Sequence, residues 1–309
     1  MIHFSRYRAI TVFSSMALMV IFYLITFLKY GGFERSITFN GGIRISILLP
    51  SDMNRDTLEK AAIAIGIPTP QVKLTSAHNN QYDLEVGPAA KELLEKQVHA
   101  NGDKKADSGI GAIVEERLLA QLKLPARSIT ARETMAASYG DELWGIATKS
   151  LLACIGLIGI YLALRFHFSF ALGAALSLVH DVFLTIGFIG VARIEPSIPV
   201  VAAVLTIVGY SINDTIVIFD RIRKNAEDHA QMSSKVIMDS AMSQTLSRTL
   251  VTSILTLISM LSLLMGGAET LHDFAVVLIF GIIMGTYSSI FIAAHSVQYY
   301  EELVARFKR

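Results

Sequence analysis

Blocks of apolar residues separated by short polar stretches dominate the hydropathy pattern of this chain. The hydrocarbon core of a bilayer is about 30 Å thick and takes roughly 20 residues of α-helix. Six blocks are about that long. The pattern therefore predicts a polytopic α-helical membrane protein with six transmembrane helices, over about Ala9–Leu28, Gly145–Leu164, Ser169–Ala192, Ser197–Phe219, Thr249–Gly266 and Ala275–Tyr299.

One long polar region, residues 30–143, separates the first two predicted helices, and its pattern is typical of a small α+β domain. Alternating stretches predict strands, and one stretch with apolar residues at i, i+3, i+4 and i+7 predicts an amphipathic helix. The order βαββαβ favours a ferredoxin-like domain. Its elements are Ser36–Leu49 with a kink at Gly41-Gly42, Asn54–Ile65, a hairpin over Val72–Val86 around Asn79-Asn80, a helical region over Ala89–Leu122 interrupted at Asn101-Gly102 and Gly109–Gly111, and a last strand over Arg127–Met135.

These elements divide the chain into four parts. We expect residues 1–29 to be the N-terminus and first helix, 30–143 an external domain, 144–299 a five-helix bundle, and 300–309 a basic tail. Within the bundle, the fourth and fifth helices are joined by a long polar segment, Asp220–Ser247, which is amphipathic from Ser233 onward.

Composition and charge agree with a membrane protein and predict its orientation. The chain has 309 residues, of which 52% are hydrophobic and 17% charged, with a mean hydropathy of +0.50. The net charge of +1, without a basic stripe interleaved with aromatics, does not indicate nucleic-acid binding. The short loops assigned to one side carry most of the Lys and Arg. We therefore expect both termini in the cytoplasm, a retained first helix, and residues 30–143 in the periplasm or outside the cell.

Polar residues inside the fourth predicted helix are the strongest functional candidates. A carboxylate within a spanning helix costs about 2.5–3.5 kcal/mol on insertion scales, yet Asp214 lies there with Ser211 and Asn213. Ser211 and Asp214 share one helix face. Because a low dielectric disfavours the charged form of a carboxyl, Asp214 is suited to take up and release a proton. The alternative is a neutral carboxyl that hydrogen-bonds neighbouring helices and serves only packing.

Three further charged or titratable residues lie near this helix. Arg248 opens the fifth predicted helix; hydropathy alone favours a side chain that extends to water, but an ion pair with Asp214 is geometrically open. His180 and Asp181 lie mid-way along the third predicted helix. Two titratable neighbours at that depth are not expected to face lipid, so Asp181 is a candidate for a proton relay, and His180 a weaker one.

Small residues in the last two helices favour packing over ligand contact. These are Thr249 in the fifth helix and the pair Gly281 and Gly285, spaced as GxxxG, in the sixth. The single cysteine, Cys154, excludes a disulfide within the chain. The sequence contains no HExxH, CxxC, GxxxxGK[ST] or GxSxG motif, so we expect no metal, no cofactor and no enzymatic chemistry.

Four stretches carry a resemblance to a known family: Leu178–Val182, Val208–Arg223, Thr245–Leu250 and Gly281–Ser289. Together with one helix, an external domain and five more helices, they are similar to the SecF family, the smaller membrane subunits of bacterial SecD–SecF protein-export complexes in the RND superfamily. The resemblance implies a proton relay through Asp214 and Arg248, driven by the proton motive force. It also implies three partners: SecD, the Sec translocon channel and unfolded secretory polypeptides.

Two other classes of function remain open. One is a proton-coupled RND-type exporter of small molecules or lipids, for which a single domain of about 110 residues on a single half-bundle is unfavourable. The other is a passive scaffold for the translocon, which predicts that Asp214 and Arg248 tolerate neutral replacement.

Overall fold

The computed structural model describes residues 3–34, 41–76, 79–100, 109–135, 137–229, 231–266 and 271–307. The chain forms two compact units. One consists of Met1–Glu34 and Ala147–Arg309, and the other of Arg35–Ile146.

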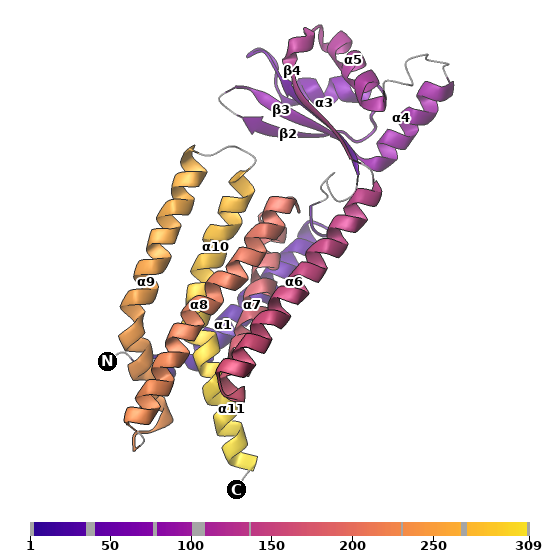
Figure 1. Ribbon diagram of the computed structural model, residues 1–309. Coiled ribbons are helices and arrows are strands. Elements are labelled where there is room, and N and C mark those ends of the chain that lie inside the picture. Colours follow the sequence, from indigo (N-terminus) through magenta and orange to yellow (C-terminus); the bar gives the residue numbers. More distant parts are fainter. Residues whose placement is uncertain are drawn as a thin grey trace. The chain divides into compact units, whose positions relative to one another are not determined.

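The first unit is a helical bundle. Among the described residues, six helical segments are long and apolar enough to cross a membrane, as predicted. The last of them is continuous through a short π-helical stretch, Ser289–Ala293. Figure 1 labels these helices. The segments are α1 (Arg8–Leu24) with its π-helical continuation Ile25–Lys29, α6 (Ala137–Arg165), α7 (Phe168–Val191), α8 (Ile198–Asp228), α9 (Ser234–Gly266), and α10 (His272–Ser288) with the π-helical stretch and α11 (Ala294–Phe307).

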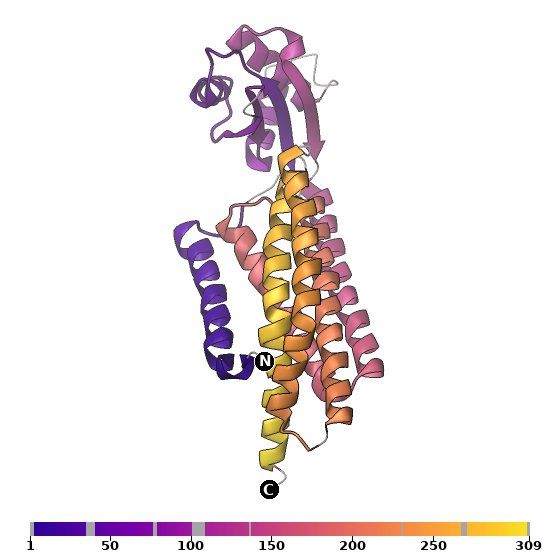
Figure 2. The ribbon, with the colours of Figure 1, turned by 90° about the vertical axis from the view of Figure 1, so that its left-hand side faces the viewer.

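Burial separates these helices into a central and a peripheral set. In the most apolar stretch of each, 61% of α7, 50% of α8 and 56% of the last segment is buried, against 6–11% of α1, α6 and α9. Figure 2 shows α1, in indigo, at one edge of the bundle. The central helices therefore have neighbours on most sides, and they are the helices in which polar side chains are shielded from lipid.

Glycines allow the two central helices α8 and α10 to approach closely. A Cβ atom added at Gly281 would overlap the side chain of Ile207, and one at Gly285 would lie 3.2 Å from the Cβ of Ser211. Without side chains at these positions the two backbones come near enough for short polar side chains to meet between them.

Helices α8 and α9 are longer than their apolar blocks. The polar segment expected over Asp220–Ser247 is mostly helical, because α8 continues to Asp228 and α9 begins at Ser234. Ion pairs from Asp220 to Arg223 and Lys224 support the added turns of α8. In α9 the added turns bury Ile237, Met238 and other apolar residues. Hydropathy marks the lipid-facing length of a helix, whereas its end depends on caps and packing.

The N-terminal turn is anchored to the extension of α9. Phe4 is buried in the helical core, and Ser5 donates hydrogen bonds from its backbone N–H and its hydroxyl to Asp239 at 2.9 and 2.8 Å. Farther along, the Tyr287 hydroxyl donates to the carbonyl of Thr11 at 2.7 Å. The turn before α1 is thus joined by hydrogen bonds to α9, and α1 itself to α10.

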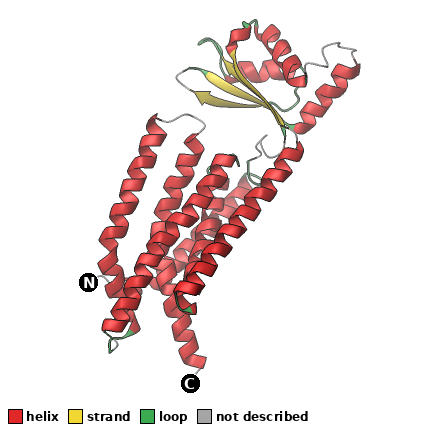
Figure 3. Ribbon diagram, viewed as in Figure 1, coloured by secondary structure: helices red, strands yellow, loops and turns green. Residues whose placement is uncertain are grey.

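The second unit is the predicted ferredoxin-like domain. Its strands, yellow in Figure 3, form a sheet beside helices drawn in red. The four strands are antiparallel in the order β2-β3-β1-β4, and along the chain helices α3 to α5 interrupt them in the order expected. Strand β1 points Ile43, Ile45 and Ile47 to one face, where they share a core with the helices. The elements are β1 (Gly42–Leu48), α3 (Arg55–Ala64), β2 (Gln71–Ser76), β3 (Gln81–Val86), α4 (Pro88–Ala100), α5 (Ile110–Leu122) and β4 (Ile129–Met135).

Two asparagine side chains stabilise the start of α3 and the turn between β2 and β3. The Asn54 side chain accepts a hydrogen bond from the Thr57 N–H and so caps α3. Asn80, in the hairpin between β2 and β3, has a φ of +50° and donates to the carbonyls of Leu49, Pro50 and Met53. The predicted start of the first strand over Ser36–Asn40 and the interruption at Asn101-Gly102 lie outside the described residues.

The close approach of α8 and α10 makes a prediction about stability. We expect Gly281→Leu to lower the free energy of unfolding by about 1–3 kcal/mol, because the new side chain must displace Ile207. Thermal unfolding in detergent measures the effect. Gly156→Leu on α6 is the matched control, since an added Cβ there meets nothing within 4 Å. Equal melting temperatures for the two variants would contradict the tight helix contact.

Candidate functional site

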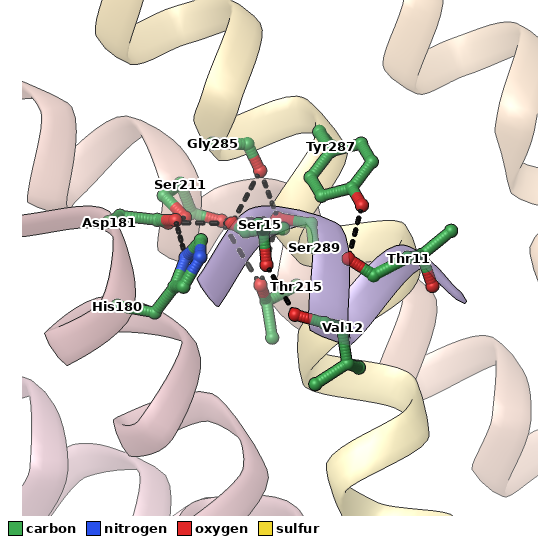
Figure 4. Close-up of polar contacts among 11 residues, drawn as sticks. Thr11, Val12, Ser15, His180, Asp181, Ser211, Thr215, Gly285, Tyr287 and Ser289 are labelled. Carbon is green, nitrogen blue, oxygen red and sulfur yellow. Dashed lines mark hydrogen bonds and ion pairs between the residues drawn. The ribbon is translucent and has the colours of Figure 1, made fainter. Parts of the chain in front are cut away.

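Three central helices meet at the carboxyl group of Asp181. This residue of α7 is 1% exposed. Its Oδ2 accepts hydrogen bonds from the Ser211 hydroxyl of α8 at 2.6 Å and from the Ser288 hydroxyl of α10 at 2.7 Å, and its Oδ1 lies 3.0 Å from Nδ1 of His180. Figure 4 shows Asp181 between His180 and Ser211. Both oxygens of this buried carboxyl are therefore paired.

A second layer of hydroxyl groups extends the network along α8 and α10. The Thr215 hydroxyl donates to the carbonyl of Ser211 at 3.2 Å and to the Ser289 hydroxyl at 3.0 Å, while Ser289 donates to the carbonyls of Ser211 and Gly285 (Figure 4). The π-helical turn begins at Ser289. Its wider turn lets two consecutive serines, Ser288 and Ser289, both be fully buried against α7 and α8.

The sequence marks Thr215 as a polar residue inside the fourth apolar block, next to Asp214, but sequence reasoning did not single out Ser288 or Ser289. These two lie inside the last apolar block as a pair of hydroxyl residues. This pair of adjacent hydroxyl residues inside an apolar helix was the sequence signal that could have identified them. Helical periodicity assigns adjacent residues to faces about 100° apart, so it gave no reason to expect both of them in one network.

Asp214, one turn along α8 from Ser211, has a different environment. It is 3% exposed, so its carboxyl does not face lipid or water. Its Oδ1 has only a long 3.5 Å contact with the Asn213 amide, and its Oδ2 lacks a hydrogen-bond partner within the described part of the chain. An ionised carboxylate is costly to keep in such a place. Asp214 is thus a buried acid with spare hydrogen-bonding capacity.

The cation that acts electrostatically on Asp214 is Arg248 of α9. Its side chain is exposed and lines an open pocket of about 590 Å³. The ion pair that the sequence left open is not formed as a direct contact, since over the described ranges no carboxylate oxygen lies within 4 Å of the guanidinium. Attraction between the two groups therefore acts across a gap.

Helices α8 and α9 are antiparallel neighbours. The Tyr210 hydroxyl of α8 donates to the Ser253 hydroxyl of α9 at 3.4 Å. Asp214 follows Tyr210 by four residues on α8, and Thr249 precedes Ser253 by four residues on α9, so each lies on the same helix face as a residue of this contact. Thr249 is buried, and its hydroxyl, like Oδ2 of Asp214, has no hydrogen-bond partner in the part of the chain that is described.

The candidate residues from the sequence thus fall into two clusters and a packing pair. Asp181, His180 and Ser211 form the paired network. Asp214, the less satisfied acid, forms the second cluster with Asn213 of its own helix and with Arg248 and Thr249 of α9. Gly281 and Gly285 lie at the contact of α8 with α10. Within the described ranges no group of three or more His, Cys, Asp or Glu side chains is arranged to hold a metal ion.

Comparison with known proteins gives consistent relatives. A family model described as "Protein export membrane protein SecD/SecF, C-terminal" matches residues 115–303. The protein translocase subunit SecF of Haemophilus influenzae is 33% identical over 293 residues, which cover 94% of this chain and 83% of that protein.

The chain also matches part of a longer protein. The protein translocase subunit SecDF of Thermus thermophilus is 34% identical over 85% of this chain. The chain spans only 34% of the length of that relative. A crystal structure of SecDF from the same organism, described as a translocon-associated membrane protein, superposes with a TM-score of 0.78 at 30% identity and covers 97% of this chain.

The contrast between the two acids can be tested through stability. We expect Asp181→Ala to lower the free energy of unfolding by about 1–3 kcal/mol, because the Ser211 and Ser288 hydroxyls lose their shared acceptor. Asp214→Ala removes an acid with an unpaired oxygen and should not lower stability. Thermal unfolding of both variants in detergent measures the difference. A larger loss for Asp214→Ala would contradict the assignment of Asp181 as the structural acid.

Proposed function

Because the chain belongs to the SecD/SecF family of protein-export membrane proteins, we propose that it is a SecF-type accessory subunit. In this proposal it uses the proton motive force to assist the export of unfolded secretory polypeptides through the Sec translocon channel. Its setting is the bacterial inner membrane, which it crosses as a multi-pass protein.

The observation that carries the proposal is the state of Asp214. A group that exchanges protons has to be shielded from bulk water and yet remain free to change its bonding. Asp214 is buried, has one oxygen without a partner, and lies within electrostatic reach of Arg248. Asp181 lacks this freedom, because both its oxygens are already bonded.

The cycle then has two states. When Asp214 is ionised, its attraction to Arg248 favours one arrangement of α8 and α9. A proton that enters from outside neutralises the carboxyl, weakens this attraction and favours a second arrangement; release of that proton to the inside restores the first. A membrane potential supplies about 2.3 kcal/mol per charge per 100 mV, which is enough to bias a two-state element.

Asp181 enters the proposal as a buried acid that transmits the helix movement, since its own oxygens are already bonded. It bonds to Ser211, one turn from Asp214 on the same helix. A shift of α8 that follows protonation of Asp214 would therefore stretch or shorten the bonds at Asp181, and the α7–α8–α10 contact would transmit the movement. His180 holds the other oxygen of Asp181 during this step.

The partner in the proposal is SecD. The Thermus relative is a single protein about three times as long as the matched region. In the proposal, a separate SecD chain forms the part of the complex that the rest of the Thermus relative forms within a single chain. Arg248 is exposed on α9, and a charged side chain at this depth requires a polar neighbour, such as protein, water or a headgroup, rather than lipid tails beside it.

Two rival functions make different predictions. A proton-coupled exporter would move a small molecule or lipid without a secretory polypeptide. A passive scaffold would require the protein but not the charge of Asp214. The buried and poorly paired acid favours the relay over the scaffold, because an acid with no exchange role is better replaced by an apolar side chain.

The relay can be tested by removing the charge alone. We expect Asp214→Asn to assemble normally in the membrane and to lose the stimulation of export by the proton gradient, measured in inverted vesicles with and without an uncoupler. Asp273→Asn, which alters an exposed carboxyl in the first turn of α10, is the control and should retain full stimulation. Full stimulation in the Asp214→Asn protein would refute the relay. If removal of the whole protein abolishes stimulated export while the Asp214→Asn protein retains it, the protein would instead act as a scaffold.

The proposed orientation places both termini in the cytoplasm and residues 30–143 in the periplasm. In a Cys154→Ser background, we expect a membrane-impermeant maleimide to label Glu92→Cys in cells with a permeable outer membrane. Lys235→Cys, on α9, should be labelled only after the inner membrane is opened. Both positions are exposed, so accessibility within the protein does not limit the reaction. The reverse labelling pattern would contradict the orientation.

A further inference from the structure

A basic pocket lies between α6, α8 and α9, outside the Asp181 network. It has a volume of about 590 Å³. Its charged lining comes from all three helices and consists of Arg165, Asp220, Arg221, Lys224 and Arg248. Four basic side chains against one acid give this lining a net charge of +3.

Asp220, the one acidic residue in the lining, already pairs with several basic side chains. The Asp220 carboxylate lies 3.7 Å from Arg165, 2.8 Å from Arg223 and 3.2 Å from Lys224. Arg221 donates to a neutral amide, that of Gln244. Arg248 has no carboxylate within 4 Å in the described part of the chain, and its electrostatic partner is the more distant Asp214. The protein therefore leaves most of the positive charge in this pocket without a counter-charge.

The pocket opens beside an apolar surface. Helix α6 ends at Arg165, and the preceding turns expose Leu157, Ile160 and Leu164 by 69%, 60% and 85%. Tyr161 belongs to both regions, since it lines the pocket and is 51% exposed. A ligand that fits this arrangement has an anionic group for the pocket and long apolar chains for α6.

We propose that the pocket binds the headgroup of an anionic phospholipid, whose acyl chains lie along α6. Guanidinium groups form charge-assisted hydrogen bonds with phosphate oxygens, and basic pockets between membrane helices are suited to anionic headgroups. The phosphate accepts hydrogen bonds from Arg165 and Arg221 and lies close to Lys224. A free phosphate ion would use the same donors but would gain nothing from the apolar surface of α6.

The bound lipid also bears on the proton relay. A phosphate beside Arg248 competes with the ionised Asp214 carboxyl for the same guanidinium. Anionic lipid would then favour the state in which Asp214 is released from Arg248. This consequence rests on the proposed function, whereas binding of the lipid itself does not.

The experiment uses the full chain, purified in detergent and incubated with equal amounts of phosphatidylglycerol and phosphatidylethanolamine of matched acyl chains. Native mass spectrometry counts the lipids that remain bound. We expect the wild type to retain phosphatidylglycerol preferentially. The double variant Arg165→Gln/Lys224→Gln should retain it about tenfold less strongly.

The matched control is Arg6→Gln/Lys235→Gln. It removes two exposed basic residues that are outside the lining of the pocket, and so changes the net charge equally. Its retention should stay within about twofold of the wild type. Melting temperatures show whether both double variants are folded. Even if one variant does not fold, the preference of the wild type for phosphatidylglycerol over phosphatidylethanolamine tests the site.

Four results would overturn the proposal: equal retention of the two phospholipids by the wild type, equal loss in both double variants, displacement of the lipid by inorganic phosphate, and loss of the lipid on co-purification with the partner half. The third would indicate a site for free anions, and the fourth a site that the partner occupies. No proton gradient is involved, so failure of lipid binding is distinguishable from failure of the relay.

Discussion

The bundle depends on one constraint: a polar group surrounded by apolar helices must find its partner on another helix. Asp181 meets this constraint with hydroxyls from α8 and α10 and with the imidazole of its own neighbour, His180. Because these bonds form where the helices cross, they fix the relative positions of α7, α8 and α10 at one level of the bundle. Small side chains make this possible. Gly281 and Gly285 bring α10 close to α8, and the π-helical turn at Ser289 directs two hydroxyls inward.

The same constraint distinguishes the two buried acids. Asp181 lies among central helices that surround it with donors. Asp214 lies on the side of α8 that faces α9, a helix with only 11% of its most apolar stretch buried. Among the described residues no donor is bonded to Oδ2 of Asp214, and its electrostatic partner is an exposed arginine across a gap. A well-satisfied acid stabilises one arrangement of helices, whereas a poorly satisfied acid is sensitive to the arrival of a proton. The structure therefore contains a fully paired acid on α7, Asp181, and an incompletely paired acid on α8, Asp214.

The side of the bundle formed by α6, α8 and α9 combines charge with apolar surface. Arg248 belongs both to the environment of Asp214 and to the lining of the basic pocket. Whatever anion lies in that pocket acts on the guanidinium that Asp214 also attracts. The proposed proton site, the proposed SecD-type partner and the lipid proposed for the pocket are thus connected through one side chain.

Local patterns along the chain predict much of this protein. The six spans, the ferredoxin-like order of elements and the hairpin at Asn79-Asn80 were predicted correctly, because hydropathy and turn chemistry are local properties. The positions of Asp181 and Asp214 inside apolar blocks were equally evident. Which acid is satisfied depends instead on how the helices cross: Ser211 shares a helix face with Asp214 but donates to Asp181 across the α7–α8 contact. The crossing also brings Ser288 and Ser289 into one network, and packing extends α8 and α9 past their apolar blocks. Partners of this kind come from segments 30 to 107 residues apart, and helical periodicity contains no information on how such segments cross.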